Sequence, residues 1–212
     1  MNPLHKIPLF PLGVVLFPGM PLPLHIFEER YKAMISECLE QQSVFGVVYY
    51  TGENFYKIGC TARIRDVLKR FDDGRMNIVT EGCDRFMIHR VTNDKPYLQG
   101  EVEYIDDISE NIVEETELSR AAAQTFKDAV KLINKEEVPD LNLLDAKRIS
   151  YIIASSAGFS LNERQAFLEM NSTAERLRKA TSALRRLMER HKMTSDIESI
   201  ISGNGYLHNS KL

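Results

Sequence analysis

Cysteine is scarce in this sequence and is nowhere arranged in a motif. Cys38, Cys60 and Cys83 are the only cysteines among 212 residues, and no C-x-x-C is present. This spacing excludes a zinc knuckle and a thioredoxin-type redox motif. With no secretion signal in the sequence, it predicts free thiols in a reducing, cytoplasmic setting.

Long uninterrupted apolar runs are also missing. The most apolar stretch before the first expected helix, Leu9–Tyr31, contains four of the chain's eight prolines. Because proline interrupts a helix repeatedly here, the stretch can be neither a signal peptide nor a membrane span. We expect short extended segments instead, joined by proline-containing turns and leading into a helix near Glu28.

The sequence carries none of the short motifs that mark common catalytic sites. It has no G-x-x-x-x-G-K-[ST] phosphate loop, no G-x-S-x-G nucleophile elbow and no H-E-x-x-H zinc motif. Its five histidines are scattered, so a metal site would need side chains from distant segments. We therefore expect a protein that is not an enzyme and that uses no cofactor or metal ion.

Charge is nearly balanced overall but uneven along the chain. The net charge is −3, which disfavours the chain as a whole as a nucleic-acid binder. Residues 101–117 hold eight acids and no base, whereas residues 176–192 hold seven Lys or Arg and one acid. Each run fits a solvated face. The alternative is that the basic run docks on an acidic partner or on this chain's own acidic segment.

Strand-like patterns fill the first half of the chain, interrupted by one amphipathic helix predicted at Glu28–Gln41. The pattern in Ile58–Arg70 slips at Asp66–Leu68, which indicates a bulge. Asp72-Asp73-Gly74 then indicates a hairpin turn. Strands or extended segments are predicted at Lys6–Phe10, Val14–Phe17, Pro21–His25, Val44–Tyr50, Ile58–Arg70, Arg75–Glu81, Cys83–Thr92 and Tyr97–Ile105.

The apolar period changes to about 3.6 in the second half, which indicates helices. Capping boxes at Ser160–Glu163 and Ser172–Glu175 predict the starts of two of them. Segregated strands and helices indicate an α+β chain, with a β-rich part at 1–108, a helical bundle at 109–193 and a flexible tail at 194–212. The predicted helices are Ile112–Asn134, Leu143–Ala157, one from about 161 to Met170, and one from about 173 to Lys192.

Four stretches of the sequence match one known family, in the same order. They are PLFPLGVVLFPGMPLPLHIFEERY (Pro8–Tyr31), IGCTARIRDVLKRFDDGRMNIVTEGCDRFMIHRV (Ile58–Val91), YLQGEVEYIDD (Tyr97–Asp107) and LDAKRISYIIASSAGFSLNERQAFLEMNSTAERL (Leu144–Leu177). They resemble the opening, the long hairpin, the last β segment and the helical part of the N-terminal, substrate-binding domain of Lon proteases. The similarity extends over nearly the whole chain, roughly Pro3–Lys192.

The resemblance implies a PUA-like pseudo-barrel of mixed strands followed by a helical bundle. It also implies a role in recognising exposed segments of other proteins. The ATPase and Ser-Lys protease motifs of full-length Lon have no counterpart in this sequence, so the resemblance does not extend to proteolysis. We therefore expect a stand-alone, non-catalytic module that binds unfolded or partner polypeptides and no membrane.

A polypeptide-binding role requires an exposed apolar patch or groove. The proline-rich first segment is the best source of one, although most of so apolar a stretch should be core. The candidate contacts are Phe10, Leu12, Phe17, Leu24, His25 and Phe27.

Two alternatives remain open at this point. RNA binding would use a basic sheet face made by Arg63, Arg65 and Arg85, although the net negative charge makes nucleic acid the weaker choice. An uncharacterised enzyme acting on a small molecule ranks last, because no nucleophile, base and orienting group stand in a recognisable pattern.

Overall fold

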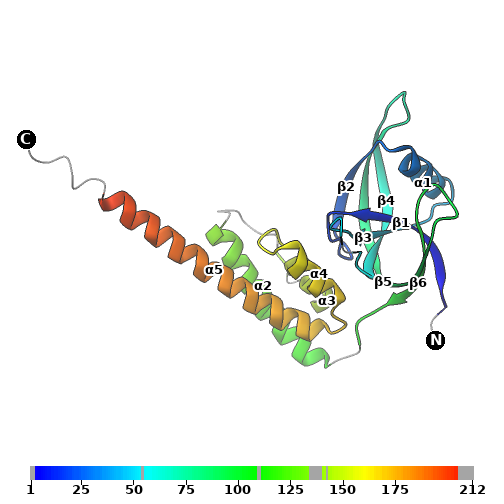
Figure 1. Cartoon of the computed structure of the whole chain (residues 1–212). Coiled ribbons are helices and arrows are strands. Elements are labelled where there is room, and N and C mark those ends of the chain that lie inside the picture. Colours follow the sequence, from blue (N-terminus) through cyan, green and yellow to red (C-terminus); the bar gives the residue numbers. More distant parts are fainter. Residues whose placement is uncertain (1–2, 54, 109–110, 134–139, 142, 205–212) are drawn as a thin grey trace, which may run out of the picture.

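Strands and helices are segregated along the chain, as the sequence predicts (Figure 1). The computed structural model describes residues 3–53, 55–108, 111–133, 140–141 and 143–204. We call the part that contains the sheet the β half and the part that follows it the helical half. In chain order the elements are β1 His5–Leu12, β2 Pro21–Ile26, α1 Glu29–Glu40, β3 Phe45–Tyr49, β4 Ile58–Arg70, β5 Met76–Thr92, β6 Gln99–Ile105, α2 Ile112–Ile133, α3 Ala146–Ala154, α4 Leu161–Glu169 and α5 Thr173–Asn204.

The strands form one sheet that closes on itself. Their order is β2-β5-β4-β3-β1-β6, and β6 pairs with β5 as well as with β1. β1 is parallel to β3, whereas the other pairings of named strands are antiparallel. The double pairing of β6 leaves it without a free edge. The predicted pseudo-barrel of mixed strands, followed by a helical bundle, is therefore confirmed.

The long strands β4 and β5 carry the bulge that the sequence pattern indicates. Their register shifts between Ile64 and Asp66 and again between Val67 and Lys69. Beyond these shifts they continue into a hairpin, whose turn holds Gly74 at a φ of 81°. Glycine adopts this left-handed conformation without the steric cost that other residues carry, so the predicted turn is confirmed.

Two strand predictions are wrong. The separate strands expected at Arg75–Glu81 and Cys83–Thr92 form one continuous strand, β5. Val14–Phe17 is a loop between β1 and β2 rather than a strand. The Phe17 side chain is fully buried and belongs to the apolar core of the helical half. Leu16 is buried in the core of the β half, so the apolar character of this segment reflects packing in both cores and not pairing in the sheet.

The helical half is built around α2 and α5, which lie side by side (Figure 1). α2 starts at Ile112, as predicted, whereas α3 is shorter than the predicted Leu143–Ala157. α5 continues to Asn204, well past the predicted end near Lys192. Its last turns extend beyond the other helices in Figure 1. Residues 205–212 of the predicted tail lie outside the described residues.

The two capping predictions explain where the last helices begin. The Ser160 hydroxyl accepts a hydrogen bond from the Glu163 amide. In return, the Glu163 carboxylate accepts a hydrogen bond of 2.8 Å from the Ser160 amide, so α4 starts with a capping box. The Ser172 hydroxyl accepts the Glu175 amide at 2.9 Å immediately before α5. Each bond satisfies an amide that has no partner within the helix.

Candidate functional site

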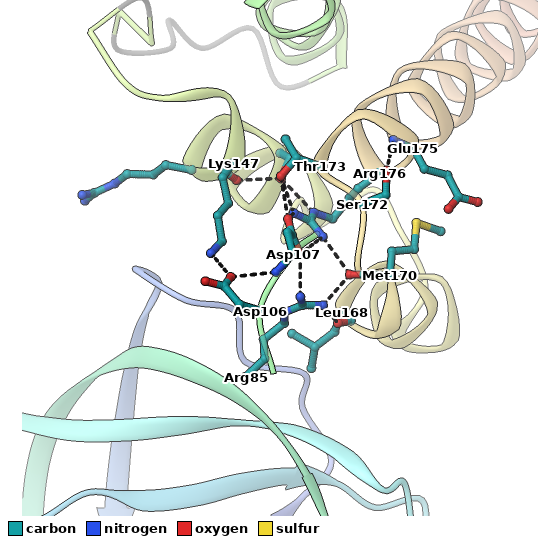
Figure 2. A network of polar contacts seen from close by, with 12 residues as sticks. Arg85, Asp106, Asp107, Lys147, Leu168, Met170, Ser172, Thr173, Glu175 and Arg176 are labelled. Atoms are coloured by element: carbon teal, nitrogen blue, oxygen red, sulfur yellow. Dashed lines mark hydrogen bonds and ion pairs between the residues drawn. The ribbon is translucent and has the colours of Figure 1, made fainter. Parts of the chain in front are cut away.

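A buried cluster of charged side chains joins the two halves of the molecule (Figure 2). Arg85 comes from β5, Asp107 from the segment after β6, and Arg176 from the first turn of α5. The Asp107 carboxylate forms an ion pair with each guanidinium. Arg85 and Arg176 are only 2% and 0% exposed. We call this Arg85–Asp107–Arg176 cluster the interdomain clasp.

The remaining donors of the clasp bind groups of the helical half. Arg85 donates through Nη1 to the Leu168 carbonyl at 2.8 Å and also to the Met170 carbonyl. Arg176 donates through Nε to the Ser150 hydroxyl at 2.8 Å. Burying charges is costly unless such hydrogen bonds satisfy them. The clasp therefore requires one arrangement of the two halves.

The Asp107 carboxyl is held in its charged form. Burial acts to raise its pKa, but the hydrogen bond and charge of Arg176, the hydroxyl of Thr173 and the charge of Arg85 act in the opposite direction. The net result is a pKa below the usual range of an aspartate. The clasp is therefore ionised at neutral pH.

Two further contacts reinforce the junction. The Phe17 ring lies 6.0 Å from the Tyr151 ring of α3, measured between centroids. Gly82 on β5 leaves room for the loop that carries Phe17, because a Cβ atom at Gly82 would lie 2.2 Å from the Phe17 carbonyl oxygen. Lys147 of α3 forms an ion pair with Asp106 beside the clasp. The junction is thus closed by apolar packing as well as by charge.

A different kind of surface lies where β2 ends and the β4–β5 hairpin turns. The His25 ring centroid lies 5.9 Å from that of Phe27 and 6.1 Å from that of Phe71. Lys69 Nζ and the Arg75 guanidinium carbon lie 4.5 and 4.9 Å from the Phe71 centroid. We call these five residues the hairpin patch. Phe27 is 60% exposed, so the patch presents apolar surface beside positive charge.

Strand register explains why these side chains meet. His25 of β2 pairs with Asn77 of β5, which in turn pairs with Lys69 of β4. The His25 Nδ1 and the Asn77 Oδ1 lie 2.6 Å apart, while the next residue of β2, Ile26, points into the core.

The six residues predicted to contact a polypeptide divide between the core and the surface. Phe10 and Phe17 are 6% and 0% exposed, so neither is accessible to a partner in this structure. His25 and Phe27 are exposed and belong to the hairpin patch. The other two, Leu12 and Leu24, are half-buried against the core of the β half.

The three arginines of the RNA alternative do not form a basic face. Arg85 is buried in the clasp and bound to Asp107, which corrects its assignment to an exposed surface. Arg65 is exposed but forms an ion pair with Glu81. Arg63 is exposed. Strand alternation placed Arg85 outside the barrel, but it gave no sign that the helical half covers that part of the sheet.

Sequence reasoning missed the individual clasp residues and the Phe71 ring, but it contained one useful signal. The basic run at 176–192 and the acidic run at 101–117 do meet, through Arg176 with Asp107 and Arg178 with Glu114. The alternative in which the basic run docks on the chain's own acidic segment is therefore confirmed for Arg176 and Arg178 alone. The later bases of the run, from Arg185 to Lys192, are exposed, as expected of a solvated face. Phe71 carried no such signal, because it stands alone before the turn.

Other chemistry is limited in the part of the chain that the structure describes. Cys38 and Cys60 are buried and Cys83 is half-buried. Burial raises the pKa of all three thiols, which makes them poor nucleophiles at neutral pH. Within the described residues, no group of three His, Cys, Asp or Glu is placed to hold a metal ion, and no helix is long and apolar enough to cross a bilayer.

Comparisons with known proteins agree with this architecture. The family model of the ATP-dependent protease La (LON) substrate-binding domain matches residues 6–186. The Lon protease of Anaeromyxobacter dehalogenans is 26% identical over 215 residues, which cover 93% of this chain and 25% of that protein. The Lon protease of Buchnera aphidicola is 28% identical over 188 residues, covering 81% and 24%. The chain thus spans about a quarter of the length of these relatives.

Two solved structures share the fold. The Lon N-terminal domain protein from Xanthomonas campestris aligns with a TM-score of 0.66 at 24% identity, covering 84% of this chain and 98% of that one. The N-terminal domain of the Mycobacterium avium complex Lon protease aligns with a TM-score of 0.66 at 17% identity, covering 85% and 98%. Because the family model matches most of its length, this chain belongs to the LON substrate-binding domain family.

Proposed function

We propose that this chain is a non-catalytic module that binds exposed apolar segments of other polypeptides through the hairpin patch. The observation that carries the proposal is the 60% exposure of Phe27 beside His25 and Phe71. Folding normally buries a ring of this size, and exposed apolar groups that gather in one place are typical of binding surfaces. Membership of a substrate-binding family supports the same role.

The charges around the patch indicate which segments it prefers. Lys69 and Arg75 contact the faces of Phe71 and bring two cations to the same surface. Arg75 also pairs with Asp73, but Lys69 has no acidic partner among the described residues. Since opposite charges improve both specificity and association rate, the best ligands combine apolar or aromatic residues with acidic ones.

The module acts by binding alone, in a reducing cytoplasm. The poorly nucleophilic thiols support a role without catalysis. The three free cysteines support the compartment. The sheet and the helices act as two subdomains joined by the clasp, in which the β half carries the binding surface.

A peptide array scanned across an unfolded client protein tests this proposal. We expect the chain to bind peptides in which aromatic or aliphatic residues alternate with acids. Phe27→Ala should weaken that binding, whereas Met193→Ala should not, although Met193 is similarly exposed at 67% on α5. Lys69→Gln should reduce selectively the preference for acidic peptides. Uniform absence of binding across the array, or equal losses in the Phe27 and Met193 variants, would overturn the proposal.

A further inference from the structure

A small pocket opens beside the clasp, between the β half and α3. Its volume is about 240 Å³, and both halves supply its walls. Pockets for drug-sized ligands usually measure roughly 300–1,000 Å³, so this one suits a small molecule or the last residue of a chain. The polar side chains that line it include Cys83, Asp84, Tyr104, Lys147 and Tyr151.

Tyr151 lines this pocket, and its buried hydroxyl is unusual. Tyr151 is only 2% exposed, yet its hydroxyl has no hydrogen-bond partner in the part of the chain that the structure describes. Buried hydroxyls nearly always have one. Burial raises the pKa of Tyr151 to about 12, so the group keeps its proton and is a hydrogen-bond donor. Its ring is fixed by Phe17 and by the Arg176 guanidinium, 4.2 Å from the centroid.

Lys147 supplies further donors to the same space. Its ammonium forms an ion pair with Asp106, as Figure 2 shows. An ammonium has three N–H donors, so this single pairing leaves donors for a ligand. The Lys147 side chain is 41% exposed, which allows it to adjust its position.

The charges around the pocket favour an anion near Tyr151. Behind this residue, the clasp combines two guanidinium groups with one carboxylate and so carries excess positive charge. The neighbouring Lys147 and Asp106 offset each other. Asp84 is exposed at the rim, and no hydrogen bond or ion pair engages its carboxylate within the described residues. That carboxylate is suited to accept an N–H group.

We propose that this pocket binds a carboxylate that carries an N–H group close to it, as in a free amino acid or at the C-terminus of a polypeptide. The carboxylate accepts hydrogen bonds from the Tyr151 hydroxyl and the Lys147 ammonium, while the N–H group donates to Asp84. Charge-assisted bonds of this kind are stronger than neutral ones. The pocket lies at the junction of the halves and away from the hairpin patch, so this site does not depend on the proposed function.

Titration of the ¹⁵N-labelled full chain, followed by NMR, tests the proposal. The probes are acetyl-trialanine with a free carboxylate, the same peptide with a C-terminal amide, and alanine. We expect the free-acid peptide to shift the backbone amide signals around Tyr104, Lys147 and Tyr151, and the amidated peptide to bind at least about tenfold more weakly. If alanine matches the free-acid peptide, the ligand is a small amino acid; if only the peptide binds, it is a chain end. Either result supports the carboxylate site.

Two variants separate binding from folding. Tyr151→Phe keeps the ring and removes a hydroxyl that has no partner in the protein, so it should leave the unfolding midpoint unchanged or raise it while weakening binding about tenfold. Lys147→Gln should also weaken binding, whereas Lys179→Gln, which removes another partly exposed lysine that pairs with an acid, should not. Equal binding of acid and amide, shifts away from the pocket, wild-type affinity in Tyr151→Phe, or no shifts at roughly millimolar peptide would overturn the proposal.

Discussion

The interdomain clasp and the hairpin patch both contain arginine, but the environments of their charged groups are opposite. In the clasp, Arg85 and Arg176 are buried and Asp107 neutralises part of their charge. In the patch, Lys69 and Arg75 lie on the surface around Phe71, and Phe27 faces solvent. Buried charges with saturated hydrogen bonds fix a structure, whereas exposed rings and cations remain available to a partner.

This comparison predicts that the two regions respond differently to substitution. Changes at the clasp should alter stability strongly, and should alter binding only through loss of the folded chain. Changes at the patch should alter binding with little effect on stability.

Asp107→Ala should have the largest effect on stability. It leaves two buried guanidinium groups without their counterion, a change that typically costs about 3–5 kcal/mol. Urea unfolding followed by circular dichroism measures the loss. Arg178→Ala is the matched control, because it breaks an exposed ion pair with Glu114 and should cost less than about 1 kcal/mol. Similar losses in both variants would show that the clasp is no stronger than a surface pair.

Acid should weaken the clasp through the same carboxylate. The folded pKa of Asp107 lies below its ordinary value of 3.8, so its contribution to stability is complete above that value. The contribution disappears as the pH falls through the lower, folded pKa. The difference in unfolding free energy between the wild type and Asp107→Asn should therefore be constant near neutral pH and shrink below about pH 4. A difference that grows on acidification would contradict this assignment.

Gly82→Ala should destabilise the junction by a steric route. The added Cβ would lie 2.2 Å from the Phe17 carbonyl oxygen, so the loop that carries Phe17 into the helical core must move. Overpacking of this kind typically costs about 1–3 kcal/mol. Gly13→Ala is a useful control, since a Cβ there has no atom within 4 Å. Thermal unfolding of the two variants measures the difference, and equal midpoints would show that the loop is not tightly held.

Phe27→Ala should have the smallest effect on folding and a clear effect on binding. Exposed substitutions usually change stability by less than about 0.5 kcal/mol. An aromatic contact in an interface often contributes about 1–2 kcal/mol, which corresponds to a loss of affinity of roughly 5- to 30-fold. Calorimetric titration with an apolar, acidic peptide from the array measures the affinity. Loss of stability with unchanged affinity would place Phe27 in the scaffold rather than in the binding surface.

The sequence predicted local structure well because local patterns determine it. The bulge in β4 follows from a slip in alternation, and the start of α4 follows from Ser160 and Glu163. Long-range burial was harder to predict. Arg85 and Phe17 both lie where the helical half covers the β half, and no local sequence pattern predicts this burial.

The same limit explains the mixed result for the binding residues. His25 and Phe27 lie near the end of β2, and whether an apolar residue there is covered depends on the neighbouring hairpin. Phe71 joins them only because strand register brings β4 and β5 beside β2. An isolated aromatic residue before a turn gave no indication of this contact.

Site-specific photocrosslinking to an unfolded client tests the central claim most directly. The photoreactive amino acid benzoylphenylalanine would replace Phe27 in one protein and Met193 in another, since both positions are well exposed. We predict strong crosslinking from position 27, to client segments rich in apolar and acidic residues, and little from position 193. Equal crosslinking from both positions, or crosslinking from position 193 alone, would contradict the assignment of the hairpin patch as the polypeptide-binding surface.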